Sequence, residues 1–104
     1  MQYSVNDIQQ ESVSNITTVT TIVAAPGAGY RIVVLGYLLT LDAAGEYSWS
    51  SASTALMGTQ EVTADTPVGA FASTGVLHCA ENETLRLTAT TAANGFVRYV
   101  IARA

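Results

Sequence analysis

The chain has 104 residues, of which 49% are hydrophobic and only 12% are charged, and its net charge at neutral pH is −4. This length is typical of one domain with a single core, but about a quarter of an average soluble domain is charged, so part of the surface is expected to be covered. Four arginines and no lysine, scattered along the chain, exclude the basic surface that favours nucleic acid or an anionic membrane as a partner.

Strand-forming stretches separated by turn residues run along the chain from residue 16. Residues 16–25 are dense in β-branched residues, which favour strands, and the sequence PGAG ends this stretch. Residues 30–41 predict a long strand, and the loop DAAGE that follows is expected to turn it back as a hairpin. Weaker strand signals follow at 56–57, 60–63, 68–71 and 74–80.

The last two predicted strands, 83–90 and 96–103, are joined by TAANG, whose Asn94-Gly95 pair is a strong signal for a two-residue hairpin turn. About eight strands and no helix predict an all-β fold, a single antiparallel β-sandwich of the jelly-roll type. Its interior is expected to contain Leu85, Leu87, Ala89, Val100 and either Ile32 or Val33.

The strand predicted at 30–41 is apolar on both of its sides. Alternation along a strand places Arg31, Val33, Leu35, Tyr37, Leu39 and Leu41 on one side, and Tyr30, Ile32, Val34, Gly36, Leu38 and Thr40 on the other. The sequence does not choose which side faces the core. Three or four side chains of this size would each forgo about 1.5 to 3 kcal/mol if left in water. The second side is therefore expected to be covered by another copy of the chain or by a larger assembly.

The chain is therefore predicted to be a homo-oligomer. Residues 1–15 are mostly polar with spaced apolar residues, and they are expected to form an N-terminal arm that docks on a neighbour, with 16–104 as the sandwich domain. A frayed tail or an edge strand is the alternative for the arm. The predicted oligomer or partner interface consists of Tyr3, Val5, Ile8, Val33, Leu35, Tyr37, Leu39, Tyr99 and Ile101.

Few residues form a pattern suited to chemistry. His78 and Cys79 are adjacent, and adjacent residues of a strand point to opposite faces, so they cannot act together. Glu81 and Glu83 would suit a calcium site or half of a glycosidase pair, but charged residues in a turn are ordinary. We therefore expect no catalytic residue, no metal and no cofactor.

Tyr47 and Trp49 are the strongest candidates for a binding site. Two residues apart on a strand, they share a face and could form a flat platform that stacks on sugar rings. The favoured interpretation is that they fill the core or a subunit interface, where aromatic residues are enriched. Their exposure decides between the two.

Signals for export or membrane insertion are not recognisable in the sequence. The first fifteen residues lack the basic start and apolar core of a signal peptide. The longest apolar run, 32–39, is far shorter than the roughly 20 residues of a membrane helix. The protein is expected to be made in the cytoplasm and to have no membrane partner.

Three segments carry a resemblance: VAAPGAGYRIVVLGYLLTLDAAGEYSWSS, CAENETLRLTAT and NGFVRYVIARA. They are similar to small jelly-roll β-sandwich proteins of tailed bacteriophages, namely capsid decoration (cement) proteins and related virion domains. The resemblance covers residues 16–104 and rests on turn and hydrophobic residues, with no active-site motif. It implies a virion protein, most often a trimer, that binds the major capsid protein or another virion protein. A glycan- or receptor-binding module of a phage fibre or tail is the alternative.

Overall fold

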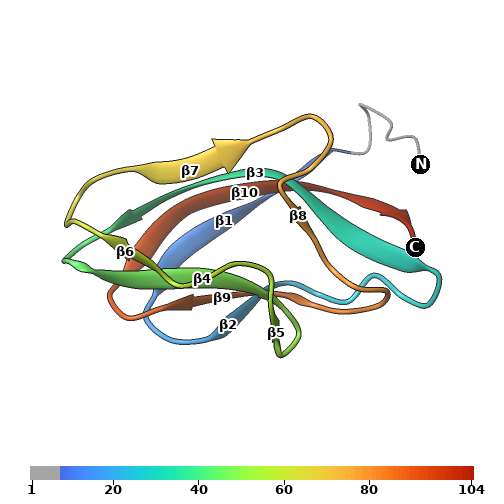
Figure 1. Cartoon of the computed structure of the whole chain (residues 1–104), viewed down its shortest axis with the longest axis horizontal. Coiled ribbons are helices and arrows are strands. Elements are labelled where there is room, and N and C mark those ends of the chain that lie inside the picture. Colours follow the sequence, from blue (N-terminus) through green and yellow to red (C-terminus); the bar gives the residue numbers. More distant parts are fainter. Residues whose placement is uncertain (1–7) are drawn as a thin grey trace.

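The computed structural model describes residues 8–104, which form two antiparallel sheets packed face to face (Figure 1). The predicted all-β antiparallel sandwich is confirmed, with ten strands instead of about eight. Within the described range no helix is long and apolar enough to span a membrane. The strands are β1 (Gln9–Ile16), β2 (Thr20–Val23), β3 (Tyr30–Leu41), β4 (Gly45–Ser51), β5 (Thr54–Ala55), β6 (Gln60–Val62), β7 (Val68–Phe71), β8 (Leu77–His78), β9 (Leu85–Ala89) and β10 (Ala93–Arg103).

Each sheet has five strands. Sheet A has the order β1-β10-β3-β7, and β8 also pairs with β3. Sheet B has the order β2-β9-β4-β5, and β6 also pairs with β4. In Figure 1 the strands of sheet A form the upper layer and those of sheet B the lower layer. The two longest strands, β3 and β10, lie side by side at the centre of sheet A.

Both hairpins expected at the ends of long strands are wrong, because the chain crosses between the sheets at these points. The loop after β3 leads from sheet A to β4 in sheet B, and β9 and β10 also lie in different sheets. Asn94 and Gly95 are inside β10, opposite Thr40 and Leu39 of β3. Gly95 has a φ of +149°, and a Cβ there would lie 1.8 Å from the Leu38 carbonyl oxygen. Glycine is thus used for close approach of two strands, not for a turn.

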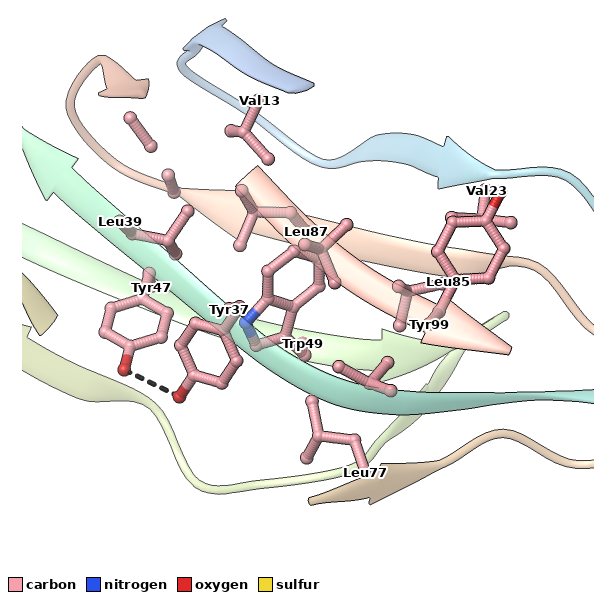
Figure 2. Close-up of a cluster of buried hydrophobic side chains, with 14 of the residues drawn as sticks. Val13, Val23, Tyr37, Leu39, Tyr47, Trp49, Leu77, Leu85, Leu87 and Tyr99 are labelled. Carbon is pink, nitrogen blue, oxygen red and sulfur yellow. Dashed lines mark hydrogen bonds between the residues drawn. The ribbon is translucent and has the colours of Figure 1, made fainter. Parts of the chain in front are cut away.

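The core lies between the two sheets. Its centre is an aromatic group in which the Tyr37 ring lies 5.4 Å from that of Trp49 and 6.0 Å from that of Tyr47, between ring centroids (Figure 2). Ile32, which was one of two alternatives, belongs to this core, whereas Val33 and Val100 form a separate cluster. The expectation that Val100 lines the interior of the sandwich is therefore wrong. The other residues expected inside are there: Leu85, Leu87 and Ala89.

A β-bulge explains why β3 is apolar on both sides. Arg98 of β10 pairs with Gly36, but the next residue, Tyr99, pairs with Val34, so Leu35 is an extra residue in β3. Such an extra residue changes which alternate side chains face the core. Before the bulge the core contains Ile32 and Val34, and after it the core contains Tyr37, Leu39 and Leu41.

The boundary expected between residues 15 and 16 falls inside β1. This strand is an edge of sheet A and pairs antiparallel with β10, with Gln9 opposite Tyr99. Its Val13 is buried in the main core, so residues 9–15 belong to the sandwich as the edge-strand alternative had it. An edge strand that buries only one or two side chains can be otherwise polar, which is why this segment resembled an arm. Tyr3 and Val5 lie outside the described residues.

Candidate functional site

The two sheets differ in the side chains that they turn away from the core. Sheet B turns out Ser48, Ser50, Arg86 and Thr88, which pair across β4 and β9. Sheet A turns out a group of apolar side chains that are exposed or half-buried, bordered by one arginine. We call this group the outer patch. It consists of Ile8, Leu35, Leu38, Phe71, Phe96 and Arg98, around Gly36.

Strand pairing brings the outer patch together from β3, β7 and β10, and Ile8 lies just before β1. Gly36 in the middle of β3 lies opposite Phe71 of β7 on one side and Arg98 of β10 on the other. One pair further along, Leu38 lies opposite Phe96. A Cβ on Gly36 would lie only 1.9 Å from Cδ1 of Phe71, so the missing side chain lets this ring lie directly on the strand.

Three apolar side chains of the patch are more than one third exposed. Phe71 is 57% exposed, Ile8 44% and Leu38 37%. The rings of Phe71 and Phe96 lie 6.2 Å apart between centroids, at an angle of 42°. Two aromatic rings with flanking leucine side chains are the composition of an interface centre more than of ordinary surface.

Arg98 borders the patch in a defined position. Its Cζ lies 5.7 Å from the centroid of the Phe96 ring, within the range of a cation–π contact. Its Nε donates a hydrogen bond of 3.1 Å to Oε1 of Gln10 on β1. These two contacts hold the guanidinium beside the apolar side chains.

A shallow hollow of about 290 Å³ lies beside Phe71. Apolar side chains and the stem of Arg98 make most of its wall. The residues that line it are Ile8, Leu35, Phe71, Ala72, Ser73 and Arg98. A hollow of this kind accepts one side chain more readily than a whole small molecule, because ligand pockets are usually larger and enclosed.

The rest of the apolar outer face of sheet A is covered within the chain. Val33, Val100 and Ala102 form a small buried cluster, with Leu35 at its border. The segment after β7 packs on it, since a Cβ on Gly75 would lie 2.6 Å from Cγ1 of Val33. The second side of β3 is therefore half covered by the chain itself and half left in the outer patch.

Most residues of the predicted interface lie elsewhere than expected. Tyr37, Leu39 and Tyr99 are buried in the core between the sheets, so they offer no side-chain surface to a partner. Ile101 is partly buried against the same core, and Val33 is buried in the small outer cluster. Only Ile8 and Leu35 belong to the outer patch. The bulge is the reason, because a regular strand would have kept Leu35 and Tyr37 on one side.

Tyr47 and Trp49 are buried and form no exposed platform. The hydroxyl groups of Tyr37 and Tyr47 are 3.0 Å apart and share a hydrogen bond. Burial, and then this bond, raise the pKa of Tyr37 well above its usual range. The indole Nε1 of Trp49 is also buried and has no hydrogen-bond partner among the described residues. The sugar-binding interpretation of these rings is therefore wrong.

The residues that sequence patterns offered for chemistry have structural roles. Cys79 is buried in the core, and loss of solvation raises the pKa of its thiol, although a hydrogen bond with Ser51 opposes the shift. Glu81 Oε2 accepts a hydrogen bond of 2.7 Å from the backbone N–H of Gly29, and Glu83 Oε1 accepts one of 2.6 Å from the Ser51 hydroxyl. Both carboxylates thus tie loops at one end of the sandwich. Among residues 8–104 no three His, Cys, Asp or Glu side chains are grouped to bind a metal.

Sequence patterns missed Leu38, Phe71, Phe96 and Arg98 as site residues. One signal pointed to the right place, namely Gly36 in the middle of an apolar strand. A glycine there often marks a strand onto which another group packs closely. The identity of that group, Phe71 of the short strand β7, depends on the pairing of distant segments.

Comparisons with known proteins add no relative of this chain. No model of a known protein family matches it, and neither the curated proteins nor the solved structures contain a match to it.

Proposed function

We propose that this chain is a non-enzymatic structural subunit that works by protein–protein contact, as a decoration or cement protein on the head of a tailed bacteriophage. One observation carries the proposal: sheet A turns a partly exposed apolar patch outward while sheet B turns out serine, threonine and arginine. The patch holds copies of the chain together, and the assembled copies bind the major capsid protein or another virion protein.

Energetics support an assembly role for the patch. Burying a side chain of the size of Phe, Leu or Ile is worth about 1.5 to 3 kcal/mol relative to leaving it in water. Phe71, Ile8 and Leu38 are all more than one third exposed, so a partner that covered them would gain several such contributions. Contiguous apolar patches on soluble proteins mark interaction sites.

The more specific role rests on the resemblance of residues 16–104 to phage decoration proteins, and a virion location follows from it. A jelly-roll-like sandwich that binds a capsid needs no active site, in agreement with the structural roles of Cys79, Glu81 and Glu83. The competing function, a glycan- or receptor-binding module, depended on exposed rings at Tyr47 and Trp49, and both are buried.

The proposal is tested with heads purified from a deletion mutant of the phage that encodes the chain. The purified protein is mixed with these heads, and the amount that sediments with them is measured against protein concentration. We expect saturable binding by the unchanged chain. Phe71→Asp, which places a charge in the outer patch, should bind far less, whereas Ser50→Asp, which places the same charge on sheet B, should bind normally. Heads that retain none of the unchanged chain would refute the capsid role.

A further inference from the structure

We infer that a second copy of this chain covers the outer patch, with Phe71 of each copy inserted into the hollow of the other. This dimer uses the same outer patch as the proposed function, and it rests on that function only in being placed on a phage head. It starts from two neighbouring features of sheet A, the side chain of Phe71 and the hollow beside it.

Phe71 is the protruding feature. It is the most exposed large hydrophobic side chain among residues 8–104, at 57%. Its ring lies directly on the backbone of Gly36, since a Cβ on that glycine would lie 1.9 Å from Cδ1 of Phe71. A ring supported from below by a strand and open on its other side is well placed to enter a partner.

The hollow is chemically suited to an aromatic ring. The hollow has a volume of about 290 Å³, with Ile8, Leu35 and Ala72 as apolar walls and Arg98 along one side. The Arg98 guanidinium already lies over the Phe96 ring. A second ring in the hollow would lie beside the same guanidinium, which would then contact an aromatic ring on two sides. Cation–π contacts of this kind strengthen when they are removed from water.

The position of the two features favours a two-fold pair. Phe71 is itself part of the wall of the hollow, so the knob and the hollow lie side by side on one sheet face. One partner that faces this sheet can engage both, whereas two different neighbours would collide there. A contact in which each copy gives and receives the same group is the isologous contact of a two-fold dimer. The trimer that the resemblance implies requires two different neighbours.

The available area is adequate for such a pair. A stable interface covers about 800 Å² on each partner. The molecule measures 38 by 25 Å along its two longer axes, so one broad face has an area of that order. The apolar patch would form the centre of the contact, and the polar residues of β1, such as Gln10 and Ser12, would lie at its rim.

Sedimentation equilibrium of the full chain tests the pair. We expect a reversible dimer of twice the chain mass of 10.9 kDa at about micromolar concentration. Phe71→Ala, which removes the knob, should weaken dimerisation about 30-fold or more, as for a residue central to an interface. Val19→Ala is the matched control, since Val19 is 51% exposed and lies outside the patch, and it should leave the dimer unchanged.

A complementation experiment tests the geometry. Ser73→Trp fills the hollow and leaves Phe71 in place, so it should abolish the dimer as Phe71→Ala does. A mixture of the two variants should form a mixed dimer that is weaker than the unchanged one. One copy supplies an intact ring, and the other supplies an open hollow that has lost only the Phe71 part of its wall. Near-ultraviolet circular dichroism of each variant checks that the sandwich is unchanged.

Several results would overturn the inference. A stable monomer, a stable trimer or a dimer that Phe71→Ala leaves intact would each refute the pair. A chain that dimerises only after residues 1–7 are deleted would also refute it, because the chain's own first residues would then occupy the patch. The two proposals fail separately. A monomer that binds phage heads refutes only the pair, and a dimer that binds no heads refutes only the capsid role.

Discussion

The outer face of sheet B is polar, whereas the outer face of sheet A is apolar. On sheet B, β4 reads GEYSWSS, and its side chains point alternately to the core and to solvent from Glu46 onward. On sheet A, β3 has almost no polar residue from Ile32 to Leu41, and its outward side chains are apolar. A regular polar alternation predicts a solvated face, and a continuous apolar run predicts a strand that is covered on both sides.

The outer apolar face of β3 is covered by the chain itself at one end and is partly exposed at the other. At one end of β3 the cover is the chain's own segment around Gly75, which buries Val33 completely. At the other end Leu38 remains 37% exposed. The bulge at Leu35 separates the two ends, so the outer patch begins where internal cover stops.

The largest expected effect is loss of folding, and it is tested by deleting either of two leucines in β3. The two shortened chains have the same composition. Deleting Leu35 removes the extra residue of the bulge and leaves Val34 inward, Gly36 outward and Tyr37 inward, so the sandwich should still fold. Deleting Leu38 turns Leu39 outward, reversing the end of the strand, and should abolish folding. Urea titration followed by circular dichroism measures both. If the first deletion unfolds the chain as completely as the second, the bulge is itself essential.

Alanine substitutions at two adjacent leucines compare the two faces of β3 directly. Leu39 is fully buried between the sheets, and Leu39→Ala should reduce the free energy of unfolding by about 2 to 5 kcal/mol through the cavity that it leaves. Leu38→Ala removes a partly exposed side chain and should cost less than about 1 kcal/mol in the isolated protein. Chemical denaturation of both variants checks the difference. Equal losses would place Leu38 in the core.

Removing a hydroxyl group should destabilise the fold more in the core than on the outer face of sheet B. Tyr37→Phe leaves the Tyr47 hydroxyl without its partner and should cost about 1 to 3 kcal/mol. By contrast, Ser48→Ala on the outer face of sheet B should change stability by less than about 0.5 kcal/mol. Thermal unfolding at neutral pH compares the two, and an equal effect would mean that the hydroxyl contact between Tyr37 and Tyr47 does not stabilise the fold.

The same pair predicts how stability depends on pH. Burial in the folded chain raises the pKa of Tyr37 above its usual value of 10.0, so the neutral hydroxyl is favoured in the folded state. This contribution is fully present below pH 10 and is lost as the pH rises through the folded pKa. Unfolding free energies measured from pH 7 upward should begin to fall near pH 9.0, the usual pKa of a thiol, because the fold also raises the pKa of Cys79. They should fall further above pH 10.0, where Tyr37 contributes. Tyr37→Phe should make the fall shallower, with the remainder due in part to Tyr99, whose pKa is also raised by burial.

The smallest expected effect is on the outer face of sheet B. Ser50→Val adds one apolar side chain beside Arg86, and the free energy of unfolding should change by less than about 0.5 kcal/mol. The oligomeric state should not change either, because Ser50 faces away from sheet A. A dimer strengthened by this substitution would show that sheet B, not sheet A, carries the interface.

The class of the fold was predictable because strand signals are local. The β-branched stretch 16–25 and the apolar run 30–41 predicted strands, and the number of strands predicted a sandwich. The burial of Tyr47 and Trp49 was the favoured interpretation, and both are buried. The pairing of strands was not predictable in the same way. Asn94-Gly95 has the local chemistry of a turn, but β10 runs straight through it because β1 and β3 bind the strand on both edges.

The candidate site was predictable only in its general location. The apolar excess of β3 indicated a covered second face, and Leu35 was expected in it. Ile8 was expected to dock on a neighbour as part of the N-terminal arm, and it lies instead in the outer patch of its own chain. Phe71 and Phe96 were not expected there, because their place depends on the register of β7 and β10 against β3. A bulge leaves no local signature in a run of apolar residues, so the switch of faces at Leu35 could not be read from the sequence, and Tyr37 and Leu39 were assigned to the wrong side.

The pairing of β1 with β10 has a consequence for synthesis of the protein. These strands come from the two ends of the described chain, and most other strand pairs also join distant segments. A ribosome therefore releases β1 long before residues 93–103 exist to pair with it. Native pairing of sheet A must wait until translation of those residues, and a topology so rich in non-local pairs folds slowly. During this interval the apolar run of β3 is exposed to the cell, which makes the nascent chain a natural client for chaperones.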